Sequence, residues 1–271
     1  MSQPTFSTTS QITITPHNQQ PLLTRDYPTE AELDATIAEA FEAQKAWAKV
    51  PLEERIRIGW KFIDEFKSLA QSTEPDLALE LTLQMGRPIS QIKAELDGFL
   101  DPLADVPLTD TDKPGFRRFI KRIPLGVGLV IAPWNYPYLT SINAVLSALI
   151  SGNVVLLKPS PQTPLTAERF ASALVSAGVP PGVVRVVHLS PELTRYAVEN
   201  QNVRFTSSTG SAGEGKKVER QRSTRRETTR TDPQFGNGIQ ASSEVTFLRN
   251  AGTSGKNFKR VCQRVYNMVG N

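Results

Sequence analysis

The sequence holds little cysteine and histidine and no long apolar run. One cysteine, Cys262, and two histidines occur among 271 residues, so an intramolecular disulfide is excluded and few of the usual zinc ligands are present. The stretch 142–157 is apolar but interrupted by Asn, Ser and Gly, and the first ten residues lack the basic and apolar parts of a signal peptide. We therefore expect no metal site, no membrane partner and a cytoplasmic location.

The net charge of +4 comes from one segment. Residues 214–230 contain seven Lys or Arg and three Glu, so the rest of the chain sums to zero. A charge run usually indicates a solvated or disordered segment; the alternative is a nucleic-acid patch. Residues 214–230 contain no aromatic side chain on which a base could stack, so we do not expect a nucleic-acid partner.

After a short strand-like opening, the chain to about residue 99 has a helical pattern. Thr29 and Glu32 form a capping-box sequence ahead of one helix, Pro51 suits the first turn of a second, and Gly86 with Pro88 ends a third. Apolar residues recur at helical spacing in the first two helices and are predicted to face the core. They are Leu33, Ile37, Ala40, Phe41, Trp47 and Ala48, then Ile56, Trp60 and Ile63.

From Gly126 onward, β-branched runs alternate with helical patterns. The predicted strands are 127–132, 154–158, 183–189 and 203–206, with Thr163-Pro164 opening one helix and Gly152 and Gly178 closing two. This alternation predicts an α/β fold with a parallel sheet covered on both faces. Ligands of such sheets bind beyond the carboxyl ends of the strands, so the loops after Ala132, Lys158 and Thr206 are the candidate site.

Each of these loops contains groups that suit a ligand. Pro133 and Pro137 bracket Asn135, whose carboxamide would be a stiff donor for an oxyanion, although such an Asn is also a common turn former. Lys158 could bind a ribose hydroxyl or a phosphate, or extend into solvent. The Gly, Ser and Thr residues of 206–215 suit a diphosphate at a helix N-terminus.

Three segments together resemble the NAD(P)-dependent aldehyde dehydrogenase superfamily: APWNYP, LLKPSPQTPLTAERF and TGSAGEGKKV, in this order and at these separations. The likeness extends over 29–218. It implies a Rossmann-like parallel sheet preceded by an N-terminal helical segment, NAD or NADP as cofactor, and a small-molecule aldehyde as substrate. The family reaction uses a cysteine thiolate, hydride transfer to nicotinamide and a glutamate that activates water.

The resemblance assigns roles to individual positions. Asn135 is similar to the oxyanion-hole amide, Lys158 to the lysine that binds the adenosine ribose, and Ser211 to the pyrophosphate-binding serine, with Ser208 as a competing register. Pro161 stands where many NAD-preferring relatives carry a glutamate, so the choice between NAD and NADP stays open. The cofactor-binding candidates are Ile131, Pro133, Trp134, Lys158, Ser160, Gly210 and Ser211.

Beyond Val218 the family pattern breaks down. Glu227 is the candidate general base and Cys262 the candidate nucleophile, but the register of the loop before it places Gly255 where the family has its cysteine. We therefore predict residues 1–115 as a helical segment, 116–218 as a cofactor-binding core and 219–271 as a divergent basic tail. The expected function is that of an aldehyde dehydrogenase-like chain with little or no activity. The alternative is a non-catalytic fragment that binds a dinucleotide or docks on intact family members.

Overall fold

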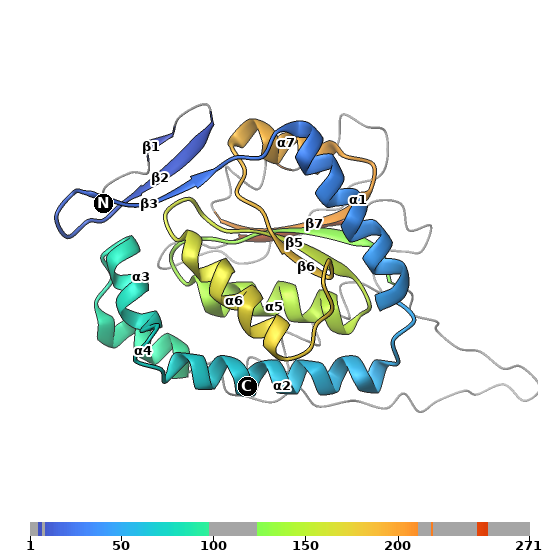
Figure 1. Cartoon of the computed structure of the whole chain (residues 1–271), viewed down its shortest axis with the longest axis horizontal. Coiled ribbons are helices and arrows are strands. Elements are labelled where there is room, and N and C mark those ends of the chain that lie inside the picture. The colour runs from blue at the N-terminus through green and yellow to red at the C-terminus, as the bar shows by residue number, and fades with distance from the viewer. Residues whose placement is uncertain (1–4, 7–8, 98–123, 211–217, 219–242, 249–271) are drawn as a thin grey trace, which may run out of the picture.

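A computed structural model describes residues 5–6, 9–97, 124–210, 218 and 243–248 of the chain. These residues form a small N-terminal antiparallel sheet, four helices, and a second sheet with helices on both faces (Figure 1). No helix within these ranges is both long and apolar enough to cross a membrane.

The chain opens with more strand than the sequence predicts. Strands β1 (Thr5–Phe6), β2 (Ser10–Ile14) and β3 (Pro21–Asp26) pair antiparallel in sequence order. Strand β2 buries Gln11 and Thr13 while Ile12 and Ile14 stay half-buried. The apolar residues of β2 therefore do not mark its packed face, which explains why the alternation of apolar residues identified only a short strand-like opening.

Four helices follow; the first three have ends close to those predicted, and the fourth was not predicted. Helix α1 (Glu30–Trp47) begins with the predicted capping box: the Thr29 hydroxyl accepts from Glu32 N–H, and the Glu32 carboxylate accepts from Thr29 N–H at 2.8 Å. Helix α3 (Leu77–Met85) ends at Gly86, whose φ of 75° is left-handed. The remaining two are α2 (Leu52–Ala70) and α4 (Ile89–Asp97).

The packed face of helix α2 matches the prediction only in part: Ile63 is buried as predicted, but Trp60 is not. Trp60 is 38% exposed, whereas Ile58, Phe62 and Phe66 are buried. The ring centroid of Phe62 lies 4.9 Å from that of Phe170, so an aromatic cluster determines which side of α2 faces inward. Ile56 and Trp60 follow the same helical spacing one stripe away, and spacing alone could not decide between the two stripes.

The second sheet confirms the predicted α/β class. Its order is β6-β5-β4-β7-β8, and β4 to β7 are parallel. These four strands are β4 (Val127–Ile131), β5 (Val154–Lys158), β6 (Val184–Val186) and β7 (Val203–Gly210). The edge strand β8 (Ser243–Leu248) pairs antiparallel with β7 and was not predicted, because it is six residues long within a poorly patterned segment.

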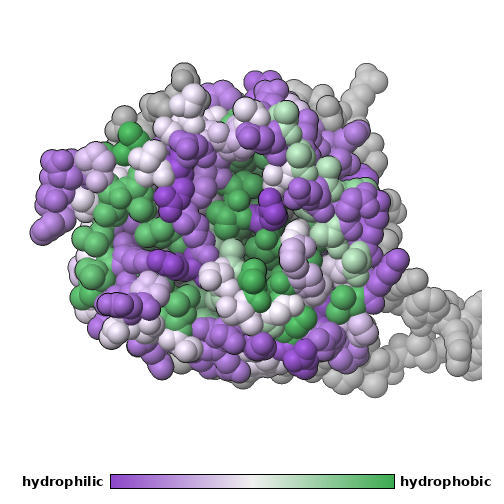
Figure 2. All heavy atoms as spheres, viewed as in Figure 1, coloured by the Kyte–Doolittle hydropathy of each residue, from purple (hydrophilic) through white to green (hydrophobic). Residues whose placement is uncertain are grey.

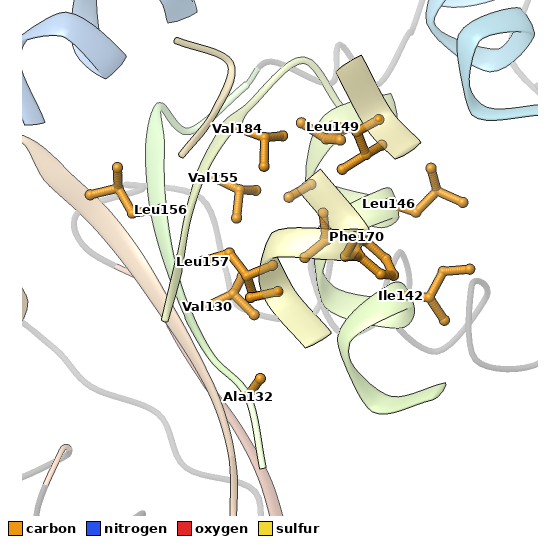
Figure 3. Packing of buried hydrophobic residues seen from close by; sticks show 14 of the residues in the cluster. Val130, Ala132, Ile142, Leu146, Leu149, Val155, Leu156, Leu157, Phe170 and Val184 are labelled. Carbon is orange, nitrogen blue, oxygen red and sulfur yellow. The ribbon is translucent and has the colours of Figure 1, made fainter. Parts of the chain in front are cut away.

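Helices cover the sheet on both sides (Figure 1): α5 (Pro137–Ile150) and α6 (Pro164–Ser176) on one, α1 and α7 (Pro191–Glu199) on the other. Val155 and Leu157 point toward α5 and α6, while Leu156 points to the opposite face (Figure 3). Gly152 and Gly178 follow the ends of α5 and α6 with positive φ, as predicted.

The carboxyl ends of the parallel strands face the N-terminal sheet and helix α3 (Figure 1). The Thr13 hydroxyl of β2 donates to the Pro161 carbonyl at 2.8 Å, and Gln162 Nε2 donates to the Gln84 carbonyl of α3 at 2.8 Å. On the face shown in Figure 2, apolar residues gather over the N-terminal sheet and in the centre of the view. The N-terminal segment therefore packs against the loops where a ligand of this fold binds.

Candidate cofactor and oxyanion site

Three residues form a row across the carboxyl ends of adjacent strands. Ile131 of β4 pairs in register with Lys158 of β5 on one side and with Ser208 of β7 on the other. Residues paired in this way point to the same face of a sheet. Side chains alternate along β5, so Lys158 points to the same face as Leu156. That face is the one covered by α1 and α7.

Lys158 is buried, with only 9% of its surface exposed. The alternative of a lysine extended into solvent is therefore wrong. Its ammonium donates to the neighbouring Pro159 carbonyl at 3.4 Å. Because a buried ammonium is costly to desolvate, this lysine is an unfavourable choice for packing alone, and its position suits a group that meets an oxygen-rich ligand.

Strand β7 is longer than predicted. The sequence places a loop after Thr206, but the strand continues to Gly210, and Thr206, Ser207 and Ser208 are buried within it. Pairing with β4 and β8 on either side explains the extension, because Ser207, Ser208 and Gly210 do not favour a strand by themselves. Ser208 thus stands in the row with Lys158, and Gly210 ends the strand half-buried.

The loop after β4 holds Asn135. Ala132 N–H donates to the Lys158 carbonyl at 2.9 Å, Pro133 is buried, and Trp134 is half-buried against the core. The Asn135 Oδ1 accepts a hydrogen bond from Tyr136 N–H at 3.1 Å. With its oxygen engaged, the carboxamide presents its nitrogen as the end that can donate to a substrate oxygen.

The loop after β5 is held by a residue that the sequence analysis missed. Gln84 of α3 is fully buried, and its Oε1 accepts from Leu165 N–H in the first turn of α6 at 3.1 Å. Thr163 occupies the predicted N-cap position but makes no side-chain cap bond. No local pattern could have identified Gln84, which is distant in sequence. Within the loop, the Ser160 hydroxyl accepts from Gln162 N–H at 3.3 Å.

The described segments at this edge contain hydroxyl and amide donors and no acidic residue. They are 132–137, 159–163, 187–190 and 209–210. A diphosphate and ribose hydroxyls need donors and a positive charge, and they are repelled by carboxylates. The donor set, with Lys158 beside it, therefore fits a dinucleotide.

Glu168, on the second turn of α6, binds residues outside the candidate site. Glu168 forms an ion pair with Arg25 of β3 at 2.7 Å and contacts His188 Nε2 at 3.1 Å. Partial burial raises the pKa of Glu168, but the hydrogen bonds from His188 and Arg25 outweigh it and lower the pKa to about 2. Glu168 therefore anchors the N-terminal sheet to α6.

Several predicted site residues lie outside the described ranges: Ser211, Glu227 and Cys262, together with Gly255 and the charged residues of 214–230. Asn135, Ile131, Pro133, Trp134, Lys158, Ser160 and Gly210 all lie at the carboxyl edge of one sheet. Within the described ranges, no cluster of three or more His, Cys, Asp or Glu side chains could hold a metal ion.

The fold and the residues at this edge are those of a Rossmann-like α/β domain whose carboxyl edge is rich in hydrogen-bond donors. The sequence profile of the aldehyde dehydrogenase family matches residues 5–232. The chain belongs to this family.

Individual relatives agree with this assignment. The chain is 31% identical over 218 residues to a 1-pyrroline-5-carboxylate dehydrogenase from Geobacillus sp. (strain WCH70), covering 76% of this chain and 42% of the relative. It is 31% identical over 200 residues to a D-glyceraldehyde dehydrogenase (NADP(+)) from Picrophilus torridus, covering 70% and 40%.

A solved structure shows the same fold. It is the NAD-dependent benzaldehyde dehydrogenase from Corynebacterium glutamicum, which is 25% identical with a TM-score of 0.64 and covers 79% of this chain and 48% of that one. The chain thus spans less than half the length of these relatives.

Proposed function

We propose that this chain binds NAD+ or NADP+ at the carboxyl edge of the parallel sheet, as the cofactor-binding part of an aldehyde oxidoreductase. The observation that carries the proposal is the row Lys158, Ile131 and Ser208, in which a buried ammonium and a buried hydroxyl flank an apolar residue. Solved structures named for NAD and for NADP share the fold.

In this proposal each side chain has a separate role. Lys158 donates to the adenosine ribose or its phosphate, and Ser208 donates to the diphosphate. Ile131, Pro133 and Trp134 line the dinucleotide with apolar surface. We assign donation to the diphosphate to Ser208 and not to Ser211, because Ser208 stands in the row with Lys158. Loop 159–163 has no carboxylate to repel a 2′-phosphate, so both NAD+ and NADP+ are compatible with it.

Asn135 would act on the aldehyde. When bound, the dinucleotide supplies the acceptor for a hydride. The Asn135 Nδ2 would donate a hydrogen bond to the aldehyde oxygen, where negative charge develops when the carbonyl is attacked. The hydrogen bond from Tyr136 N–H to Oδ1 orients the carboxamide for that task.

The binding proposal is tested by calorimetric titration of the full chain with each dinucleotide. We expect saturable binding, and an affinity lower by about 10- to 100-fold in Lys158→Met, because a hydrogen bond from a charged group contributes about 1.5–3 kcal/mol. The matched control is Lys45→Met. Lys45 is an exposed lysine of α1 paired with Glu42, and its loss should leave the affinity unchanged. Equal affinities in both variants would reject the role of Lys158.

We further propose that the chain oxidises aldehydes poorly or not at all. The support comes from the resemblance, in which Gly255 stands at the position of the nucleophile and has no side chain to attack a carbonyl. The test is formation of reduced cofactor with a panel of aldehydes. Robust, thiol-sensitive turnover that disappears in Cys262→Ala would overturn this proposal and identify Cys262 as the nucleophile. A cytoplasmic location and docking on intact family members stay predictions of the sequence.

A further inference from the structure

We propose that Arg87 is a positioning residue for the Asn135 carboxamide. The inference rests on the proposed role of Asn135 as the donor to the aldehyde oxygen. It concerns a residue of the N-terminal helical segment that no motif of the candidate site includes.

Arg87 lies in the short connection between α3 and α4. Gly86 ends α3 in the left-handed region, and a Cβ on Gly86 would lie 2.9 Å from Pro16 Cγ, so this turn is packed closely against the N-terminal sheet. Pro88 follows immediately and precedes α4. The backbone of Arg87 is therefore held between two constrained residues, and its side chain extends from a fixed origin.

Contacts with three described residues fix the plane of the guanidinium group. Nη1 donates to the Asn135 carbonyl at 3.1 Å, and Nη2 donates to the Gln91 carbonyl of α4 at 2.9 Å. The Cζ atom lies 4.2 Å from the ring centroid of Tyr136. Two donations and one stacking contact use the planar, forked geometry of arginine, which lysine lacks.

These contacts constrain the side-chain carboxamide of Asn135 through its backbone. The peptide unit between Asn135 and Tyr136 is held at both ends: Arg87 binds its carbonyl oxygen, and the Asn135 Oδ1 accepts from its N–H. Rotation of this peptide plane would break the bond that orients the carboxamide. Arg87 thus sets the direction of the Asn135 Nδ2 through the backbone, without touching the side chain.

The Arg87 contact adds a long-range hydrogen bond to this loop, beside local ones such as those from Thr140 to the Tyr136 carbonyl. Tyr136 is 45% exposed and makes no side-chain cap for α5. An oxyanion donor is effective only when it is held in place before the reaction. Arg87 connects the loop to α4, so that the N-terminal helices, and not the parallel sheet alone, determine the orientation of the donor.

The experiment uses the full chain with isotope-labelled asparagine and tyrosine, observed by two-dimensional NMR. The Asn135 carboxamide signals are identified by their loss in Asn135→Ala. In Arg87→Met we expect these signals to move toward the position of a freely rotating asparagine, and Tyr136 N–H exchange with solvent to accelerate about tenfold. Arg87→Lys should give an intermediate result. Arg57→Met, which removes an exposed arginine of α2 paired with Glu54, should change neither.

The outcomes separate this inference from the proposed function. Unchanged Asn135 and Tyr136 signals in a folded Arg87→Met, or in Arg87→Lys should the first variant fail to fold, would overturn it. Dinucleotide affinity in Arg87→Met should stay within about twofold of the parent chain, because Lys158 and Ser208 come from other strands. Absence of dinucleotide binding in the parent chain would reject the proposed function and leave the effect on the Asn135 signals measurable.

Discussion

The space beside Gly128 and beside Gly59 determines whether each position can hold a larger residue. Gly128 of β4 pairs with Phe205 of β7, and a Cβ built on Gly128 would lie 2.2 Å from Phe205 Cζ. The ring occupies the space of the missing side chain, and Phe205 is itself buried. At Gly59 of α2 the opposite holds, because a Cβ there would lie at ordinary contact distance, 3.5 Å, from Leu146 Cδ1.

The two glycines should therefore respond oppositely to the same substitution. Gly128→Ala should lower the free energy of unfolding by about 1–3 kcal/mol through overpacking. Gly59→Ala should raise it by about 0.5–1 kcal/mol, because alanine favours a helix and fills available space. Urea denaturation measures both. Adding Phe205→Leu to Gly128→Ala should recover part of the loss, and no recovery would contradict a clash with the ring.

Several residue-level features could be predicted from the sequence because they depend on neighbours in the chain. The Thr29 and Glu32 capping box, and the left-handed Gly86, are local and were predicted correctly. Gln84 and Arg87 were not predicted, since their partners Leu165 and Asn135 lie 81 and 48 residues away. Local patterns carry no information about such distant contacts.

At the scale of elements, the N-terminal sheet is joined to α6 by a charged contact. Arg25 of β3 binds both carboxylate oxygens of Glu168, at 2.7 and 2.9 Å, and His188 after β6 contacts one of them. This contact brings together a strand, a helix and a loop that are separated in sequence. It holds the N-terminal sheet beside the loop that follows β5.

The lowered pKa of Glu168 makes this docking sensitive to acid. Because the pKa in the folded chain is about 2 and the usual value is 4.5, the contribution is complete above about pH 4.5 and is lost as the pH falls toward 2. In denaturation curves measured across this range, Glu168→Gln should lack about 1–2 kcal/mol of acid-dependent stability, allowing for partial exposure.

The control for the acid experiment is Glu54→Gln, which removes an exposed partner of Arg57 on α2. An exposed pair contributes little, so the pH dependence of this variant should follow the parent chain closely. Identical curves for the parent chain and Glu168→Gln would show that Glu168 does not anchor the N-terminal sheet.

Element positions were predicted better than element faces. The strands at 127–131 and 154–158 lie within the predicted ranges, because continuous β-branched runs are typical of buried parallel strands. The packed face of α2 was predicted wrongly at Trp60, and strand β8 was not predicted. The packed face of α2 depends on the aromatic cluster around Phe170 that it meets. The formation of β8 depends on the edge of β7 with which it pairs.

At the scale of the whole molecule, dinucleotide binding should stabilise the fold. A ligand that binds only the folded chain adds about 2.7 kcal/mol to the free energy of unfolding at a hundred times its dissociation constant. Urea denaturation at that concentration of NAD+ or NADP+ should show this increase in the parent chain and in Lys45→Met. At the same concentration Lys158→Met should show a smaller one. Equal increases in parent and Lys158→Met would place the dinucleotide elsewhere.

The sequence by itself determined the α/β class, the alternation of strands and helices between Gly126 and Thr206, most helix ends there and the family, because these follow from neighbouring residues and from short motifs at set separations. Only the tertiary structure decided that Lys158 is buried beside Ile131 and Ser208, that Gln84 caps α6, and that Arg87 holds the peptide of Asn135. The reason is physical. Strand register and long-range hydrogen bonds depend on which surfaces meet after folding, and local periodicity does not encode that choice.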